Sequence, residues 1–199
     1  MLLKQLLKNL DYTLVQGCLN TEVTDIYYDS RKVTPGGLFV CIVGTQRDSH
    51  DYAADVAAKG AAVLAIQHDL PAEVLAALPD VTVVKFESTR YAMALLSTAY
   101  FGRPALEMTM VGVTGTKGKT TTTYMTHAVM DAVAGTKTGL LSGMEHDMGG
   151  QVTYTHLTTP ESLEMQQLFA EARKHKLPVV TAEISSQAYQ VHRTYGQHF

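Results

Sequence analysis

The chain has 199 residues, 46% hydrophobic and 18% charged, so it is long enough for one large or two small folded domains and too apolar to be mainly disordered. Its 16 Lys and Arg against 19 Asp and Glu give a net charge of -3, which excludes a general basic field for nucleic acid or anionic lipid. Lysine and glutamine interrupt the N-terminal leucines, and no run of 18 apolar residues occurs, so we expect neither a signal peptide nor a membrane insertion. Cys18 and Cys41 are too few for a disulfide framework and are expected to be reduced core thiols of a cytoplasmic protein.

The first half of the chain alternates between helical and strand patterns. Leucines at helical spacing predict an opening helix over residues 2–10. The further elements are expected as strands over 23–28, 38–43, 62–66 and 81–86, and as helices over 51–59, after Pro71, and from the cap Ser88 to Tyr100. This order is typical of an α/β domain. Because Gly102 and Pro104 end the last helix, we place one domain at residues 1–103 and a second at 104–199.

The second half opens with a strand over 108–113, a glycine-rich turn and a helix over 119–133. A later helix is expected to start with Thr159 as N-cap and Pro160 at its first position and to run to about His175, followed by a buried strand over 178–183. The chain then stops after about half of the ~150 to 200 residues that an open nucleotide-binding sheet uses. We therefore expect a nucleotide-binding domain that is cut short.

The strongest local signal is the segment 112–121, Gly-Val-Thr-Gly-Thr-Lys-Gly-Lys-Thr-Thr, between an apolar strand and a helix. Glycines let backbone N–H groups surround phosphate oxygens, Lys119 can reach the β and γ phosphates, and the Thr120 hydroxyl can bind Mg²⁺. The general pattern G-x-x-x-x-G-K-[ST] would need glycine where Val113 stands, so the loop is a variant. The segment predicts ATP or GTP binding, and the alternative is a glycine-rich turn that only caps a helix.

A metal-binding carboxylate is expected near such a loop, at the end of a neighbouring strand. The run Pro178-Val179-Val180-Thr181-Ala182-Glu183 is apolar until its last residue. Glu183 is therefore the candidate magnesium ligand, and a strand-end glutamate that faces water is the alternative.

Five motifs, taken together, resemble those of the Mur ligase family and follow the family's order. They are Asp29-Ser30-Arg31, Pro35-Gly36-Gly37-Leu38-Phe39-Val40, Gly115 to Thr121, Thr158-Thr159-Pro160-Glu161, and Glu183-Ile184-Ser185-Ser186. The combination is similar to the N-terminal half of the MurE-type tripeptide synthetases of that family. The resemblance implies an α/β fold, in which a small N-terminal α/β UDP-binding domain precedes a truncated P-loop-type nucleotide-binding α/β domain.

The resemblance also implies a function. It is that of an ATP-dependent ligase of peptidoglycan synthesis, which joins an amino acid to UDP-N-acetylmuramoyl-L-alanyl-D-glutamate through an acyl phosphate, with ATP and Mg²⁺ bound to a cytoplasmic monomer. The domain that selects the amino acid would lie beyond Phe199, so the identity of that amino acid stays open. A chain of this length is expected to be inactive alone.

Family roles fall on matching positions of this sequence. Lys119 is the catalytic candidate; Gly115, Thr116, Lys117, Gly118, Lys119, Thr120 and Thr121 would hold ATP; Thr120 and Glu183 would hold Mg²⁺; Ser30, Thr45 and Gln46 would contact the uridine diphosphate; and Thr158, Thr159, Ser185 and Arg193 would contact the sugar-linked peptide end. In the structural alternative Ser30 caps a turn, Thr159 only caps its helix, and Arg193 is solvated.

Two positions depart from the family pattern, and two other functions stay open. Lys117 stands where asparagine is frequent, and Gln187 stands where histidine is common, which leaves one substrate contact open. One alternative is a related ligase, either of the next pathway step or of the folylpolyglutamate type. The other is a non-catalytic module that binds a UDP-sugar or a nucleotide.

The eight histidines show no zinc-ligand spacing, so we expect no zinc site. The pairs His50-Asp51 and His146-Asp147 suggest acid and base groups, but we expect them to be solvated loop residues.

Overall fold

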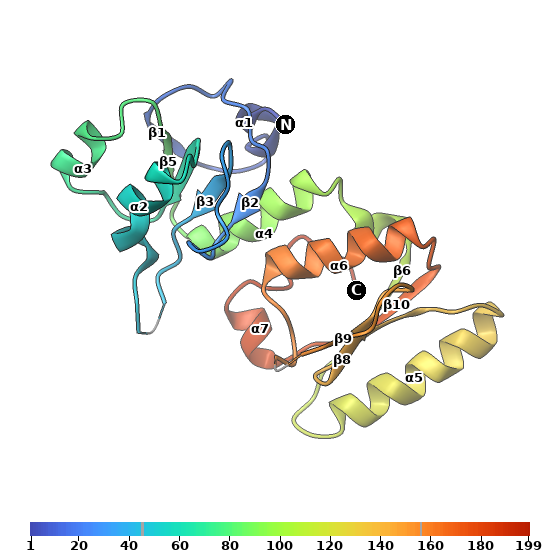
Figure 1. Cartoon of the computed structure of the whole chain (residues 1–199). Coiled ribbons are helices and arrows are strands. Elements are labelled where there is room, and N and C mark those ends of the chain that lie inside the picture. The colour runs from blue at the N-terminus through green and yellow to red at the C-terminus, as the bar shows by residue number, and fades with distance from the viewer. Residues whose placement is uncertain (45, 156) are drawn as a thin grey trace. The chain divides into compact units, whose positions relative to one another are not determined.

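In the computed structural model the chain forms two compact units, Met1–Leu96 and Ser97–Phe199, each with its own five-stranded sheet (Figure 1). The structure describes residues 1–44, 46–155 and 157–199. The units divide inside helix α4 (Thr89–Tyr100), before the boundary expected after residue 103. Both sheets contain parallel strands with helical connections, which confirms the α/β class. Among the described residues, no helix has the length and apolar character needed to cross a membrane.

The first unit is built on a sheet with the strand order β1-β5-β4-β3-β2. Its elements are α1 (Leu3–Leu6), β1 (Thr13–Gln16), β2 (Ile26–Tyr27), β3 (Leu38–Val40), the 3₁₀ helix η1 (Ser49–Tyr52), α2 (Ala53–Ala58), β4 (Val63–Ile66), α3 (Ala72–Ala76), β5 (Thr82–Lys85) and α4. Strands β2 to β5 are parallel, and β1 pairs antiparallel with β5. All four residues of β4 are buried, as expected for a parallel strand covered on both faces.

Two predictions for the first unit need correction, and one strand was missed. The opening helix has only one turn, Leu3–Leu6, although Leu3, Leu6 and Leu7 are buried as its pattern predicted, because a single turn already places these leucines inside. Strand β1 was not predicted, because three of its four residues are exposed and its sequence lacks an apolar face. Cys41 is a buried thiol, but Cys18 is exposed and does not belong to the core.

The second unit has the strand order β6-β10-β7-β8-β9. Its elements after α4 are the 3₁₀ helix η2 (Pro104–Glu107), β6 (Thr109–Val113), α5 (Lys119–Ala134), β7 (Gly139–Leu141), β8 (Glu145–Asp147), β9 (Thr153–Tyr154), α6 (Ser162–Lys174), β10 (Val179–Glu183) and α7 (Ser186–Gln190). Strands β6, β10 and β7 are parallel, and the register pairs Val113 with Glu183 at their carboxyl ends. The glycine-rich turn and Glu183 therefore start from the same edge of the sheet.

Helices α5 and α6 cover opposite faces of this second sheet (Figure 1). The core beneath α6 contains Met165, Phe169 and Ala172 of the helix, packed with Leu141 and Val180 of the strands. Short β7, β8 and β9 and helix α7 were not predicted, because segments of two to five residues carry too little periodicity.

Helix α6 begins at Ser162, with Glu161 as N-cap, so the predicted Thr159 cap is wrong. The backbone N–H of Glu161 donates to the Glu164 carboxylate (3.0 Å), which forms part of a capping box. The Thr159 hydroxyl is not available as a cap, because it bonds to the end of β10 instead.

Candidate functional site

The glycine-rich turn, residues 114–118, joins the end of β6 to the start of α5. Gly118 is the N-cap of α5 and has a φ of +76°, a conformation that favours glycine, although space around its α-carbon is open. The Thr122 N–H donates to the Gly118 carbonyl (2.9 Å), so the N–H groups of residues 119–121 precede the helical hydrogen-bond ladder. This helix start presents free donors and a partial positive charge, which suit a phosphate.

Lys119 and Thr120 begin α5 and direct their side chains to different partners. The Lys119 ammonium donates to the carbonyl of Gly115 (3.1 Å), so the side chain folds back over the turn. The Thr120 hydroxyl donates to Oε1 of Glu183 (3.1 Å). The structure thus brings Thr120 and Glu183 together from elements 63 residues apart in the chain.

Glu183 ends β10 and is 2% exposed, so the alternative of a strand-end glutamate facing water is wrong. Its second carboxylate oxygen, Oε2, accepts from the backbone N–H of Gly143 (3.1 Å), just after β7. In the described part of the chain the Glu183 carboxylate has two hydrogen-bond donors, the Thr120 hydroxyl and the Gly143 N–H, and both are neutral, so a buried carboxylate here would favour a cation beside it.

The pair formed by Thr120 and Glu183 fits Mg²⁺. This ion prefers oxygen ligands and binds through one or two carboxylates, waters and substrate phosphates. Adjacent ligands of an octahedral ion with Mg–O distances of ~2.1 Å lie about 3 Å apart, and Thr120 Oγ1 and Glu183 Oε1 are 3.1 Å apart. A rotation of the Thr120 hydroxyl would free an oxygen lone pair for the metal.

The β7–β8 turn that holds Glu183 is itself held by a second group of polar side chains. The Tyr124 hydroxyl of α5 donates to Glu145 (2.9 Å), and the Ser142 hydroxyl donates to the Glu145 carbonyl (2.9 Å). The Ser142 hydroxyl also accepts from the backbone N–H groups of Met144 and Glu145. Burial raises the pKa of Tyr124, so this hydroxyl stays a donor at neutral pH. Sequence reasoning missed these residues, although a short apolar run followed by Ser142-Gly143 signals the end of a strand.

The hydroxyl of Thr159 connects a further predicted substrate-binding residue, Ser185, to the end of β10 at Glu183. Its hydroxyl donates to the Glu183 carbonyl (3.0 Å) and accepts from the N–H of Ser185 (3.0 Å). The Ser185 hydroxyl caps α7 by accepting from Ala188 (3.2 Å). Thr158 lies beside the same carboxylate, because a Cβ on Gly143 would lie 3.5 Å from both Thr158 Oγ1 and Glu183 Oε2.

Arg193 is not solvated. Its guanidinium donates to the Thr159 carbonyl (3.1 Å) and to the Glu161 carboxylate (2.7 Å), and both side chains of this ion pair are 14% exposed. Arg193 therefore fixes the segment that carries Thr158 and Thr159, and its contact with substrate stays a prediction.

The first unit contains the residues predicted to contact uridine diphosphate. The Ser30 carbonyl accepts from Lys59 (2.6 Å), and Asp29 beside it forms a two-bond ion pair with Arg31. The Arg31 side-chain hydrogen bond, with a further backbone bond, lowers the pKa of Asp29 to about 2. Gln46 is exposed, and Thr45 lies outside the described residues.

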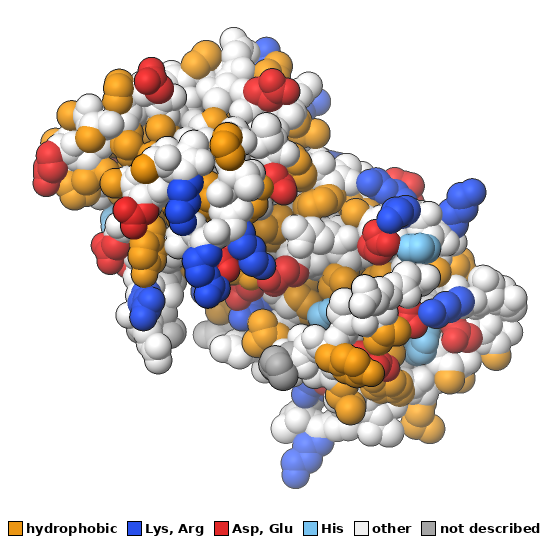
Figure 2. All heavy atoms as spheres, in the orientation of Figure 1, with side chains coloured by type: hydrophobic (Ala, Val, Ile, Leu, Met, Phe, Trp, Pro, Cys, Tyr) orange, Lys and Arg blue, Asp and Glu red, His pale blue; other side chains and the backbone are white. Residues whose placement is uncertain are grey.

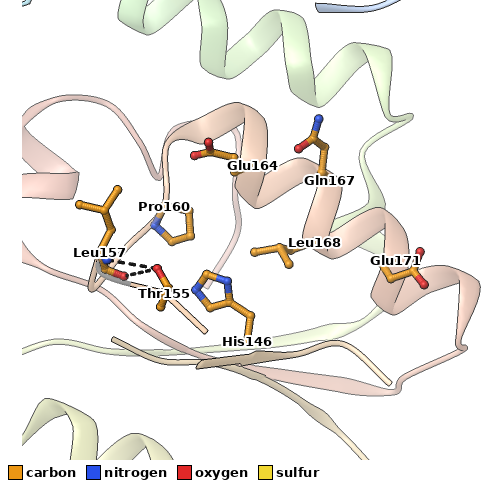
Figure 3. Close-up of a pocket in the computed structure, with 8 residues that line it drawn as sticks. All are labelled: His146, Thr155, Leu157, Pro160, Glu164, Gln167, Leu168 and Glu171. Carbon is orange, nitrogen blue, oxygen red and sulfur yellow. Dashed lines mark hydrogen bonds between the residues drawn. The ribbon is translucent and has the colours of Figure 1, made fainter. Parts of the chain in front are cut away.

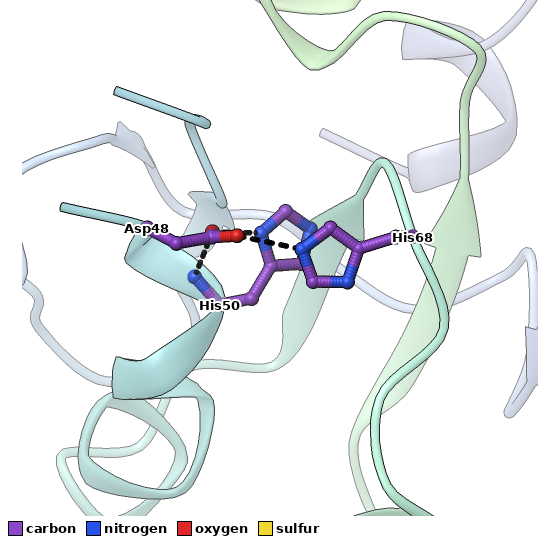
Figure 4. Close-up of side chains that lie close together, drawn as sticks. All are labelled: Asp48, His50 and His68. Carbon is purple, nitrogen blue, oxygen red and sulfur yellow. Dashed lines mark hydrogen bonds and ion pairs between the residues drawn. The ribbon is translucent and has the colours of Figure 1, made fainter. Parts of the chain in front are cut away.

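His50 was predicted to be a solvated loop residue, and this prediction is wrong. His50 is 5% exposed. The Asp48 carboxylate is hydrogen bonded to the rings of both His50 and His68, and the two rings stack with their centroids 3.8 Å apart (Figure 4). Because the Gln67 N–H donates to His50 Nε2 (2.9 Å), Nδ1 carries the proton and donates to Asp48. Both ring nitrogens of His50 are therefore used, and the cluster links the loop before η1 to the end of β4.

His146, in β8, is also buried, with 8% of its surface exposed, so its prediction as a solvated residue is wrong. Asp147 beside it is half-buried and pairs with Lys137 (2.8 Å). Alternation along β8 places these two neighbours on opposite faces of the sheet, so they do not form an acid and base pair.

The surface drawn in Figure 2 intersperses acidic and basic side chains. This agrees with the net charge of -3 and with anion binding through local features such as the start of α5.

Two family models match the chain in succession. Residues 22–101 match the model described as "Mur ligase family, catalytic domain", and residues 113–199 match "Mur ligase middle domain". The chain belongs to the Mur ligase family. The resemblance to the Mur ligase family and the α/β fold that it implied are therefore confirmed.

The relatives carry consistent names. The chain is 40% identical, over 99% of its length, to the UDP-N-acetylmuramoyl-L-alanyl-D-glutamate--2,6-diaminopimelate ligase of Clostridium botulinum, of which it covers 40%. A solved structure of a ligase with that name covers 98% of the chain with a TM-score of 0.72 at 16% identity, and the chain covers 38% of it. The MurF ligase of Thermotoga maritima, solved in complex with ADP, covers 83% of the chain with a TM-score of 0.51 at 20% identity, and 32% of that chain is covered. The chain thus spans about 40% of the length of the curated relatives that it matches.

Proposed function

We propose that this Mur ligase chain carries the UDP-substrate-binding and ATP-binding parts of an amide-bond-forming ligase of peptidoglycan precursor synthesis. The substrate of the proposal is UDP-N-acetylmuramoyl-L-alanyl-D-glutamate. The relatives' names make 2,6-diaminopimelate the first amino acid to test. A cytoplasmic location and a monomeric state are further predictions of the proposal.

The observation that carries the proposal is the convergence of Lys119, Thr120 and Glu183 at one edge of the second sheet. Lys119 supplies a positive charge at the start of α5, and Glu183, bonded to the next residue Thr120, supplies a buried carboxylate. A nucleotide triphosphate with a divalent cation complements both charges.

In the proposed reaction, a carboxylate oxygen of the terminal D-glutamate attacks the γ phosphorus of ATP, and ADP leaves. The acyl phosphate formed is then attacked at its carbonyl carbon by the incoming amine, so that an amide forms and phosphate leaves. The N–H groups of residues 119–121 and the Lys119 ammonium would orient the phosphates and stabilise charge on the transferred group.

Thr120 and Glu183 would hold Mg²⁺ in this site, and Gly143 would orient the Glu183 carboxylate. When bound, the ion supplies positive charge to the phosphate oxygens. Thr159, fixed by Arg193, keeps the segment with Thr158 beside that carboxylate, where a substrate carboxylate must approach the γ phosphate.

The test is the thermal stability of the 199-residue chain with Mg·ADP. A ligand at ~100 times its Kd raises the free energy of unfolding by about 2.7 kcal/mol. We expect Mg·ADP to stabilise the wild type, Lys119→Met to weaken its binding at least roughly tenfold, and Thr120→Val to remove most of the difference between Mg²⁺ and EDTA.

Lys32→Met is the control, because Lys32 is exposed in the first unit and takes no part in the proposed site. Equal stabilisation of the wild type and Lys119→Met by Mg·ADP would contradict the nucleotide site. The UDP-dipeptide substrate is added in a separate experiment. If Mg·ADP stabilises the chain and the UDP-dipeptide does not, the proposed substrate is wrong, whereas the proposed nucleotide site is supported.

A further inference from the structure

A cavity of about 350 Å³ lies in the second unit between α6 and the segment that contains β8 and β9 (Figure 3). The described residues of its walls are His146, Thr155, Leu157, Pro160, Glu164, Gln167, Leu168 and Glu171. The volume lies within the range of small-molecule sites and exceeds the ~30 Å³ that one water occupies in the liquid about tenfold. None of these residues belongs to the Thr120–Glu183 site.

His146 places a buried polar atom at this cavity. Its side chain reaches from the middle of β8 into the space between Thr155 and Leu168 (Figure 3). The residue is 8% exposed, and its buried Nε2 atom has no hydrogen-bond partner in the described part of the chain. Such an atom has lost its hydration without gaining a new bond, so a molecule that bonds to it would be favoured.

The neighbouring hydroxyl does not supply the missing bond. The Thr155 hydroxyl is used by Leu157, since it donates to the Leu157 carbonyl (3.2 Å) and accepts from its N–H (3.1 Å). Burial lowers the pKa of His146, so the ring is neutral at pH 7.5, with one nitrogen a donor and the other an acceptor. A hydroxyl group both donates and accepts, so a ligand hydroxyl would complement Nε2 in either tautomer of the ring.

The surface around the ring is mostly apolar. Leu157, Pro160 and Leu168 supply this part of the wall, from the segment before α6 and from the helix itself. Leu157 is 47% exposed, so it leaves apolar surface in water that a ligand would cover. Burial of such surface favours a ligand with an apolar body.

The two carboxylates of the wall already have partners. Glu164 accepts from the backbone N–H of Glu161 (3.0 Å). Glu171 pairs with His175 (2.8 Å) and Lys174 (3.3 Å). Neither carboxylate therefore requires a charged ligand, and a charged group would lose hydration on entering a mostly apolar cavity. Both points favour a ligand without charge.

We propose that this cavity binds a small neutral compound that has an apolar body and a hydroxyl group, such as a phenol or an alcohol. The body lies against Leu157, Pro160 and Leu168, and the hydroxyl bonds to Nε2 of His146. The site is separate from the proposed ligase site, so its failure would leave the proposed function untouched.

The experiment titrates four compounds into the ¹⁵N-labelled chain at pH 7.5 and follows the amide signals of residues 164–171 of α6 by NMR. Phenol is the test compound, and toluene is its match, because a methyl group replaces the hydroxyl. Benzylamine and benzoate carry the two signs of charge. We expect phenol to bind with a Kd on the order of 1 mM and at least roughly threefold more tightly than toluene. Both charged compounds are expected to bind more weakly than phenol.

Variants locate the site independently of the compounds. His146→Phe keeps an aromatic ring without nitrogen atoms, so it should lose the preference for phenol over toluene. Leu168→Trp fills the cavity and should abolish phenol binding, and it still locates the site if His146→Phe fails to fold. The matched control is Leu75→Trp, at a partly buried position of α3 in the first unit, which should leave phenol affinity unchanged.

The proposal is overturned if phenol at 20-fold the expected Kd moves none of these amide signals, which would mean a cavity that holds only water. Equal binding of phenol and toluene by the wild type, or an unchanged preference for phenol in His146→Phe, would overturn the role of the ring nitrogen. Tighter binding of either charged compound would overturn the neutral ligand, and unchanged phenol affinity in Leu168→Trp would overturn the location.

Discussion

Thr159 shows how one hydroxyl group can organise a site. The hydroxyl donates to the Glu183 carbonyl and accepts from the Ser185 N–H, and the residue is 1% exposed. The backbone carbonyl of Thr159 accepts a hydrogen bond from the Arg193 guanidinium. The side chain was predicted as a substrate contact and as a helix cap. The cap is wrong and the substrate contact stays a prediction; the structure shows that the hydroxyl joins the end of β10 to the start of α7.

Replacement of Thr159 by valine preserves the shape of the side chain but removes both hydroxyl bonds. The partly buried Ser185 N–H and the buried Glu183 carbonyl each lose a partner, so we expect the free energy of unfolding to fall by ~1–3 kcal/mol. Urea unfolding followed by circular dichroism measures this loss. Thr122→Val, on the exposed face of α5, should change it by less than ~0.5 kcal/mol, and similar values for the two variants would refute the role of the hydroxyl.

The Asp48–His50–His68 cluster predicts a pH dependence of stability. The hydrogen bond to Asp48 raises the pKa of His68, so stabilisation by this pair is complete below the unfolded pKa of ~6.5 and is lost as pH rises through the folded value. Burial alone would raise the pKa of Asp48, but hydrogen bonds from the His50 backbone and both rings outweigh it and lower the pKa to about 2. Asp48 thus stays ionised throughout this window.

We therefore expect His68→Gln to destabilise the first unit more at pH 5.5 than at pH 8.5. The difference should be below ~1 kcal/mol, because the His68 side chain is 52% exposed and solvent screens the pair. Urea titrations of both proteins at the two pH values measure it. A larger loss at pH 8.5 would show that the pair does not carry the dependence.

At the scale of elements, the β7–β8 turn positions the buried carboxylate of Glu183. Gly143 contributes a backbone N–H to this carboxylate. Ser142 forms hydrogen bonds within the turn, and Tyr124 holds the turn from α5. The turn therefore links the helix that begins at the phosphate loop to the carboxylate at the end of β10.

Tyr124→Phe tests this link, because it removes only the hydroxyl that bonds to Glu145. We expect the Mg²⁺ dependence of ADP binding to weaken roughly tenfold, the lower end of the range found for groups that orient a metal ligand, with intact folding. Tyr154→Phe is the control, since Tyr154 is 84% exposed. Unchanged Mg²⁺ dependence in Tyr124→Phe would mean that the turn holds its shape without the hydroxyl.

Elements with long periodic patterns could be predicted, whereas those defined by distant partners could not. Strand β6, helix α5 and strand β10 lie within one or two residues of their predicted bounds, because apolar runs and glycine punctuation mark them locally. From these elements alone, parallel pairing already implied that Glu183 would lie near the loop. Gly143 escaped prediction because its role depends on a backbone N–H, which every residue type except proline provides.

At the scale of the whole molecule, each unit has its own hydrophobic core. The first contains Phe39, Leu64 and Ile66, and the second contains Met165, Phe169 and Val180. The sequence predicted both sheets in outline, but it did not predict that the division between the two units would fall within α4, because the helical pattern continues without a break.

The two cores predict different responses to one core substitution. Phe169→Ala, at a position that is fully buried, should cost ~3–5 kcal/mol in the second unit. Hydrogen exchange should show faster exchange in β6 and β10, while β4 of the first unit keeps its protection. The conservative variant Phe169→Leu should show a smaller effect in the same strands, and equal acceleration in β4 would mean that the units unfold as one.

The hydrogen bonds inside the phosphate loop also affect the heat of nucleotide binding. Lys119 already donates to Gly115, and Thr120 already donates to Glu183. On binding, the Lys119 ammonium would exchange the Gly115 carbonyl for a phosphate oxygen, and the Thr120 oxygen would exchange its bond to Glu183 for the metal, so each new contact would replace an existing hydrogen bond. The enthalpy of binding should therefore be smaller than a count of bound contacts suggests, and the release of water and counterions should supply much of the driving force.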